Sequence, residues 1–184
     1  MPKTPETLLD LISGGRPDHP AIIVPDGPVV TYEALQSQVA ELAAHLEASG
    51  ISGGDRVAIV LPNGIEMIVS FLSVASVATA APLNPAYKAD ELDFYLGDTG
   101  AKALITSDGT GEGARAVVSD SVLQFSAQLS PAGRLTLTPG TPASTKTPST
   151  TPSPDAVALV LHTSGTTSRP KRVPLAHRNI AVSA

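Results

Sequence analysis

A short segment near the end of the chain combines hydroxyl groups, glycine and positive charge. Between His162 and Lys171 there are five hydroxyl side chains, one glycine and two cationic side chains within ten residues. Glycine lets backbone N–H groups approach a bound anion, hydroxyls donate hydrogen bonds, and lysine supplies charge. The segment follows an apolar run at 157–161, and ligands of open α/β sheets bind at the carboxyl ends of strands. These features together favour a polyphosphate-binding loop.

Composition alone leaves a plain surface loop as an alternative, because clusters of serine, threonine and glycine are common in loops. A Walker A loop is excluded by the spacing. That motif requires a second glycine five residues after the first, and counting from Gly165 gives Pro170 instead. The pattern therefore does not indicate an ordinary P-loop NTPase or kinase.

The order of the residues carries more information than their composition. The run Thr-Ser-Gly-Thr-Thr-x-x-Pro-Lys at 163–171 resembles the phosphate-binding signature of the adenylate-forming (AMP-binding) superfamily of acyl-CoA synthetases, aryl-CoA ligases, luciferases and peptide-synthetase adenylation domains. Similar stretches lie at 31–35, 54–58, 61–64 and 82–87. Within the superfamily, Ser168-Arg169-Pro170-Lys171 and the segment 173–179 are similar to the oxalate-CoA ligase branch of peroxisomal-type synthetases.

The resemblance implies that the family's activity uses Mg²⁺ and ATP to convert a carboxylic acid to an acyl adenylate, which is passed to coenzyme A. Lys171 would neutralise charge on the departing pyrophosphate, and such catalysis is electrostatic. The acid, ATP and coenzyme A are the expected partners. The resemblance assigns ATP phosphate binding to Thr163, Ser164, Gly165, Thr166, Thr167, Ser168 and Lys171.

Two departures from the family pattern stand out. Arg172 occupies a position where the family commonly has glycine, and a positive φ there would cost on the order of 1 kcal/mol. The chain also lacks what the family places downstream, including the acidic Mg²⁺ ligand and the C-terminal domain with its catalytic lysine. No catalytic residue or metal ligand is therefore assigned, and we expect residues 1–184 to be an incomplete N-terminal AMP-binding domain that is inactive alone.

Hydrophobic periodicity predicts the elements that must position this loop. A helix is expected from Thr31 to Gly50, a strand at 57–61, a helix at 65–80 and an extended piece at 81–83. A helix at 89–97, a strand at 103–106, a helix at 113–118, and strands at 122–125 and 157–161 follow. Strands separated by helices predict an α/β fold with a mainly parallel sheet flanked by helices, with α+β as the alternative. The sheet is expected to be incomplete and to expose an edge.

The segment 136–155 differs in composition from the rest of the chain. Seven threonines, five prolines and three serines make up fifteen of its twenty residues. Such a sequence cannot form a packed core. It is expected to be a disordered loop inserted in the domain.

The remaining composition excludes several functional classes. The chain has no cysteine, which removes disulfides and thiolate chemistry, and its four histidines are scattered, which argues against a metal site. Twelve basic against seventeen acidic residues give a net charge of −5, and aromatic residues make up 3%, which argues against nucleic-acid binding. We expect no signal peptide and no membrane span, and a cytoplasmic or peroxisomal location.

Three hypotheses remain open from the sequence. The favoured one is that the chain is the N-terminal portion of a carboxylate-CoA ligase, with oxalate as the suggested acid substrate. The second is a non-catalytic short form that keeps the loop for nucleotide or phosphate binding, or that pairs with a separate C-terminal polypeptide. The third is another adenylate-forming enzyme, such as an aryl-CoA ligase. His162 and His177 are expected to be a strand-end residue and a helix-start residue rather than catalytic bases.

Overall fold

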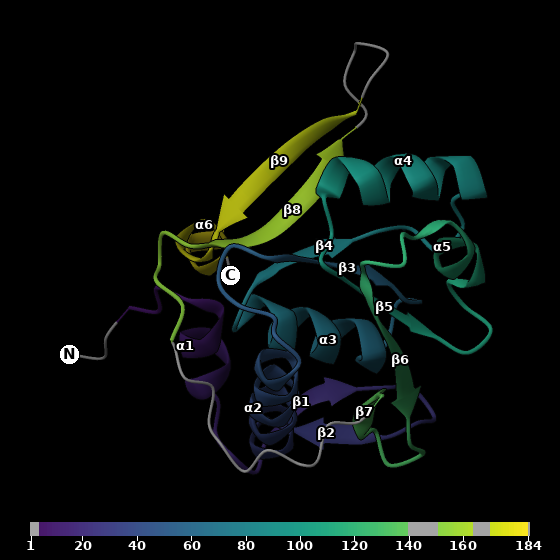
Figure 1. The fold of residues 1–184 in the computed structure, drawn as a ribbon. Helices are drawn as coiled ribbons and strands as arrows, with labels where there is room; N and C mark the ends of the chain where they lie inside the picture. The colour runs from purple at the N-terminus through teal and green to yellow at the C-terminus, as the bar shows by residue number, and fades with distance from the viewer. Residues whose placement is uncertain (1–3, 140–150, 164–169, 184) are drawn as a thin grey trace.

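A seven-stranded sheet forms the centre of the molecule in the computed structural model, which describes residues 4–139, 151–163 and 170–183 (Figure 1). Its strand order is β7-β6-β5-β3-β4-β8-β9. The five inner strands are parallel, whereas β7 and β9 pair antiparallel at the two edges. The strands are β3 (Arg56–Val60), β4 (Thr79–Pro82), β5 (Ala103–Ser107), β6 (Leu123–Leu129), β7 (Leu135–Thr138), β8 (Val157–Thr163) and β9 (Lys171–Ala176).

Helices cover both faces of this sheet, as expected for a parallel α/β fold. Helices α2 (Tyr32–Ala48) and α3 (Ile65–Ala75) contribute to the larger hydrophobic core. Helices α4 (Ala89–Thr99) and α5 (Glu112–Val117) pack on the other side and form a smaller core with residues of β3 and β5. The predicted α/β class with a mainly parallel, helix-flanked sheet is therefore confirmed.

Helix α2 forms because its sequence supplies a cap and an apolar face. The Thr31 hydroxyl accepts a hydrogen bond from the Ala34 amide at 3.2 Å, which satisfies one free N–H of the first turn. Leu35, Val39 and Leu46 recur at helical spacing and are buried. Gly50 follows the helix with a φ of 90°, a conformation that glycine adopts without steric cost. The predicted helix from Thr31 to Gly50 is confirmed.

The segment 65–80 contains a shorter helix than the sequence predicts. Helix α3 ends at Ala75, and the chain is extended again from Thr79 in β4. The reason is tertiary: the Thr79 amide donates to the Asp55 carbonyl at 2.9 Å, and its hydroxyl donates to the Val157 carbonyl at 2.8 Å. Because an apolar run buried on all sides has no diagnostic periodicity, sequence alone could not place this boundary.

Four strands were not predicted. Strands β1 (Pro20–Ile23) and β2 (Val29–Thr31) form a separate two-stranded sheet beside α2, and β7 and β9 extend the main sheet. Strand β7 also corrects the expected boundary of the Thr/Pro-rich tract, because residues 136–138 belong to it. Leu135 and Leu137 alternate inward and are buried, which holds this strand in place. Residues 140–150 lie outside the described residues, so the rest of that prediction stays a prediction.

The two ends of the described chain meet at one side of the fold. Helix α1 (Leu8–Ser13) begins with a capping box, in which Thr7 and Asp10 exchange side-chain and backbone hydrogen bonds. Helix α6 (His177–Ser183) follows β9 and lies near α1 (Figure 1). No helix within the described ranges is long and apolar enough to cross a bilayer.

Candidate functional site

The predicted phosphate-binding segment connects the two strands of a hairpin at the edge of the sheet. Thr163 is the last residue of β8 and Lys171 is the first residue of β9, and the two are paired across the strands. The Thr163 hydroxyl lies 3.5 Å from the Lys171 carbonyl oxygen. Both side chains are exposed. The remaining predicted residues, Ser164, Gly165, Thr166, Thr167 and Ser168, lie outside the described residues.

The hairpin carries Thr163 to the carboxyl end of the parallel strands, where the sheet also has two hollows. One, of about 360 Å³, lies at the ends of β3 and β4 and is lined by Asn63, Met67 and Asn84. The other, of about 460 Å³, lies over α3 and β8 and is lined mainly by apolar residues, including Phe71 and Leu161. The edge of the sheet that usually binds ligands is therefore concave here and adjoins the hairpin.

The hairpin is fastened to the end of helix α4 by three residues, Asp98, His162 and Arg172, which we call the stem cluster. His162 and Arg172 are paired across β8 and β9, one position from Thr163 and Lys171. Oδ2 of Asp98 lies 3.1 Å from His162 Nε2 and 3.1 Å from Arg172 Nε. Arg172 also donates to the backbone carbonyl of Asp98 at 2.8 Å.

His162 is the buried member of the stem cluster. Its side chain is 4% exposed, and its ring lies 4.8 Å from that of Tyr95. Because a carboxylate can only accept, we assign the Nε2 proton to the bond with Asp98. Nδ1 has no hydrogen-bond partner among the described residues. The expectation that His162 is a strand-end residue is correct for its position, but its contact with Asp98 was not foreseen.

Arg172 does not carry the backbone strain considered for it. Among the described residues other than glycine, positive φ occurs at Asp26 and not at Arg172. Arg172 lies in β9 and is paired with His162 of β8. The side chain instead pairs with Asp98, while the side chain of Lys171 stays exposed. The replacement of glycine at this position adds an electrostatic contact without a conformational penalty.

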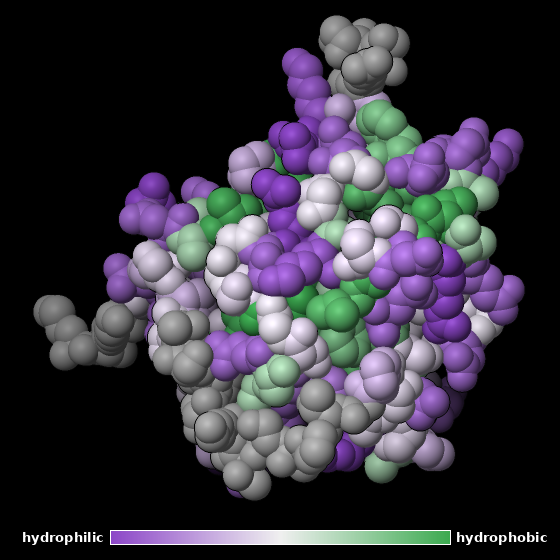
Figure 2. Space-filling model, in the orientation of Figure 1, coloured by the Kyte–Doolittle hydropathy of each residue, from purple (hydrophilic) through white to green (hydrophobic). Residues whose placement is uncertain are grey.

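Asp98 was missed by sequence reasoning, although a signal for it existed. It lies in the last turn of α4, where the helix dipole disfavours negative charge, and that turn holds no basic residue. A carboxylate in such a place indicates a cationic partner from elsewhere in the fold. The exposed surface of α4 includes three further acidic residues, Asp90, Glu91 and Asp93. Hydrophilic and hydrophobic residues are mixed on the side of the molecule where α4 lies (Figures 1 and 2).

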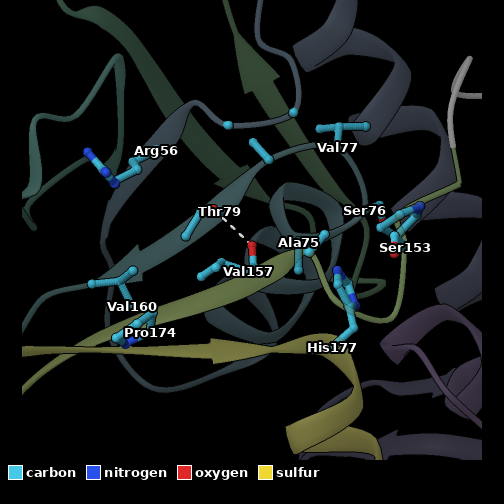
Figure 3. Close-up of a pocket in the computed structure, with 15 residues that line it drawn as sticks. Arg56, Ala75, Ser76, Val77, Thr79, Ser153, Val157, Val160, Pro174 and His177 are labelled. Atoms are coloured by element: carbon cyan, nitrogen blue, oxygen red, sulfur yellow. Dashed lines mark hydrogen bonds between the residues drawn. The ribbon is translucent and has the colours of Figure 1, made fainter.

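A further cavity, of about 600 Å³, lies at the opposite end of the sheet from the loop (Figure 3). His177, at the start of α6, lines it and points toward Ala75 at the end of α3. His177 is 1% exposed, and its Nδ1 accepts a hydrogen bond from the Leu8 amide at 3.3 Å. The Ala75 backbone is its second hydrogen-bond partner. His177 is thus a helix-start residue, as expected, and it also connects α1, α3 and α6.

Burial lowers the pKa of His177, against the opposing effects of its hydrogen bond to the Ala75 backbone and the negative charge of Asp10. Burial likewise lowers the pKa of His45, which packs edge-to-face on Phe125. For Asp55, burial is the largest single influence and opposes ionisation, but hydrogen bonds from Lys102 and Ser52 outweigh it and leave the pKa below its ordinary value. These shifts make stability depend on pH in two separate ranges.

We expect the free energy of unfolding to fall as the pH drops below about 6.5, the ordinary histidine value, because the unfolded chain then binds protons that folded His177 and His45 do not. The loss continues until the pH falls below the lowered pKa of each histidine in the folded state. It is at most about 1.4 kcal/mol per pH unit for each histidine. Stability from Asp55 is instead lost below about pH 4. Urea midpoints at pH 7.5 and 5.5 measure the first range. His177→Gln should reduce the difference, and an unchanged difference would contradict the assignment to His177.

The side chains that the fold brings together also decide whether a metal ion could bind. Within the described ranges, no group of three or more histidine or acidic side chains could hold a metal ion. The described groups at the loop-bearing end of the hairpin are instead a hydroxyl and an ammonium, on Thr163 and Lys171, which suit an anion.

Comparison with known proteins agrees with this architecture. The chain is 44% identical over 172 residues to the probable CoA ligase CCL9 of Humulus lupulus and 38% identical over 182 residues to the oxalate–CoA ligase of Arabidopsis thaliana. These matches cover 90% and 96% of this chain but 33% and 35% of the relatives, so the chain spans about a third of their length.

A solved structure of ATP-bound MatB from Rhodopseudomonas palustris superimposes with a TM-score of 0.76 and 27% sequence identity. The superposition covers 97% of this chain and 36% of that one. The fold is therefore that of the N-terminal domain of such enzymes. The family model for AMP-binding enzymes matches residues 12–184. The chain belongs to the AMP-binding enzyme family.

Proposed function

We propose that this chain is the N-terminal portion of an ATP-dependent carboxylate–CoA ligase and that residues 163–171 bind the β- and γ-phosphates of ATP. The observation that carries the proposal is the pairing of Thr163 and Lys171 at the base of this segment, at the carboxyl end of a parallel strand. The pairing holds a hydroxyl-bearing and an ammonium-bearing residue at the two ends of a loop rich in further hydroxyls. The CoA ligases among the relatives and the ATP-bound MatB support it.

In this reaction a carboxylate oxygen of the acid attacks the α-phosphorus of ATP and pyrophosphate leaves. Negative charge then accumulates on the β- and γ-phosphates, and donors already fixed there stabilise it without reorganisation. Lys171 would supply the positive charge, and Thr163 a hydroxyl at the other end of the loop. Coenzyme A would then take the acyl group. The Mg²⁺ that accompanies ATP has no cluster of ligands among the described residues, so its ligands would come from elsewhere.

Oxalate is the acid we propose first, because the sequence at 168–179 is similar to the oxalate–CoA ligase branch and an oxalate–CoA ligase is among the relatives. The alternative is a hydroxycinnamic or other aryl acid, as in an aryl-CoA ligase. A non-catalytic short form that binds nucleotide is the other alternative. The cytoplasm or the peroxisome stays the expected compartment.

The test uses the native product, recovered from cells with an antibody against the N-terminal region. Its intact mass should be well above 18.7 kDa, and it should release pyrophosphate and AMP when supplied with oxalate, ATP and coenzyme A. Release with an aryl acid but not oxalate would identify the aryl-CoA alternative. A native product of 18.7 kDa that releases no pyrophosphate with any acid would contradict the ligase proposal and support the short form.

The 184-residue chain by itself is expected to form no acyl adenylate and to bind ATP weakly. It spans about a third of the relatives' length, and β9 leaves one edge of the sheet without a neighbour among the described strands. Such an edge favours aggregation. Incubation with Mg-ATP and oxalate, followed by mass spectrometry of the nucleotides, measures adenylation directly. Detection of an oxalyl adenylate would contradict the expectation.

A further inference from the structure

The loop-bearing half of the β8–β9 hairpin extends beyond the sheet. Strand β8 pairs with β4 at a single position, Ala80 with Leu159, and β9 pairs with β8 alone among the described strands. From Val160 onward, β8 therefore has one strand neighbour, which is β9. Figure 1 shows this end of the hairpin rising past the sheet beside α4. A two-stranded ribbon is marginally stable by itself, so contacts with α4 must fix its direction.

The stem cluster supplies those contacts at one level of the hairpin. Oδ2 of Asp98 lies 3.1 Å both from His162 on β8 and from Arg172 on β9, so a single carboxylate holds both strands. The 2.8 Å bond from Arg172 to the Asp98 carbonyl also satisfies a free backbone acceptor at the end of α4. His162 is buried and Asp98 is only partly exposed, so their hydrogen bond is less accessible to water than one between two exposed side chains.

An aromatic stack supports the same contact. The Tyr95 ring lies one helical turn before Asp98 on α4, 4.8 Å from the His162 ring. Tyr87, in the segment before α4, stacks on Tyr95 with its ring centroid at 4.8 Å. The hairpin therefore rests on α4 through an apolar surface as well as through charge. This arrangement leaves little freedom for the hairpin to tilt while Asp98 is in place.

We infer that Asp98 is a positioning residue for phosphate binding: through His162 and Arg172 it fixes the hairpin whose ends are Thr163 and Lys171. The inference rests on the proposed function of residues 163–171. Without the Asp98 charge, the hairpin samples other directions, and the fraction of molecules able to bind ATP falls. The apparent affinity for ATP falls by the same fraction. The proposed function does not assign the acid or coenzyme A to this hairpin, so their affinities are expected to stay unchanged.

The first test is the kinetics of Asp98→Asn in the native-length protein. We expect the KM for ATP to rise about five- to tenfold, with the KM for the acid unchanged and kcat within about threefold. A loss of folded protein would instead lower kcat and leave every KM unchanged. Asp93→Asn, the same change at an exposed position of α4, is the matched control and should behave as wild type. A KM for ATP equal to that of the control would overturn the inference.

A double substitution tests whether Asp98 acts through Arg172. Arg172→Gln alone removes one of the two partners of Asp98 and should raise the KM for ATP roughly threefold. Added to Asp98→Asn, it should raise the KM less than about twofold further, because the pair is already broken. Asp98→Glu keeps the charge and should restore part of the affinity. Fully multiplicative effects of the two substitutions would contradict a shared action.

Trypsin digestion of the 184-residue chain tests the coupling without any activity. Trypsin does not cut before proline, so the Arg169–Pro170 bond resists, and the accessible sites near the loop follow Lys171 and Arg172. Asp98→Asn should speed cleavage after Arg172 about tenfold, and Asp93→Asn should not. Unchanged cleavage would overturn the inference even if the ligase is confirmed. Faster cleavage of the 184-residue variant, combined with no ligase activity in the native-length protein, would instead refute the proposed function while leaving the mechanical coupling intact.

Discussion

Replacing Lys171 with alanine is expected to lower ATP-dependent pyrophosphate release by the native-length protein at least about 100-fold. Lys171 is the first residue of β9, its side chain is exposed, and its backbone is fixed opposite Thr163. A positive charge that the fold presents at this position stabilises the departing pyrophosphate. The measurement is kcat/KM for ATP from coupled pyrophosphate detection.

Two further variants make the Lys171 result specific. Lys171→Arg keeps the positive charge and should retain much more activity than the alanine variant, although its planar guanidinium does not reproduce a point charge. Lys88→Ala removes an exposed ammonium before α4, distant in sequence from the loop, and should leave kcat/KM unchanged. If Lys171→Ala retained more than half of the wild-type rate, the assignment of residues 163–171 to the phosphates would be wrong.

The second large effect is on stability: His177→Ala should lower the free energy of unfolding by about 3 kcal/mol at pH 7.5. The substitution leaves the Leu8 amide and the Ala75 backbone without their buried partner and opens a void where α1, α3 and α6 meet. Water can enter from the adjoining 600 Å³ cavity, which limits the loss.

Urea denaturation followed by circular dichroism measures this effect, and the chain provides its own control. His19 is exposed and lies in a turn, so His19→Ala should change the free energy of unfolding by less than about 0.5 kcal/mol. An effect of His177→Ala as small as that of His19→Ala would show that the contacts of His177 contribute little. A large loss of ligase activity with unchanged stability would instead indicate a catalytic part for His177.

Local sequence signals were sufficient for most of the parallel core. Thr31 and the apolar spacing of 35–46 define α2, and short apolar runs define β3, β5 and β8, because these features act within one turn or one strand. The end of α3 was misplaced because Ser73 and Ser76 sit in an apolar run that could be helix or strand. The hydrogen bonds of Thr79 to Asp55 and Val157 decide that boundary, and they come from other parts of the chain.

The candidate site divides in the same way. The order of residues in 163–171 indicates phosphate binding without any structure, because a loop motif is contiguous. The stem cluster is not contiguous: Asp98 lies 64 positions from His162 and 74 from Arg172. The sequence showed arginine at 172 where the family commonly has glycine, but it did not show that Asp98 would pair with this arginine. Only the acidic residue at the unfavourable end of α4 pointed to a missing cation.

The sequence by itself determined the fold class and the main helices and strands, and the order of its residues predicts phosphate binding at 163–171. These follow from periodicity, capping and motif order, which are properties of neighbouring residues. The tertiary structure decided the order of strands, the antiparallel partners β7 and β9, and the attachment of the hairpin to α4 through Asp98. These depend on which surfaces are buried against each other, and burial is decided by the whole chain rather than by any one segment of it.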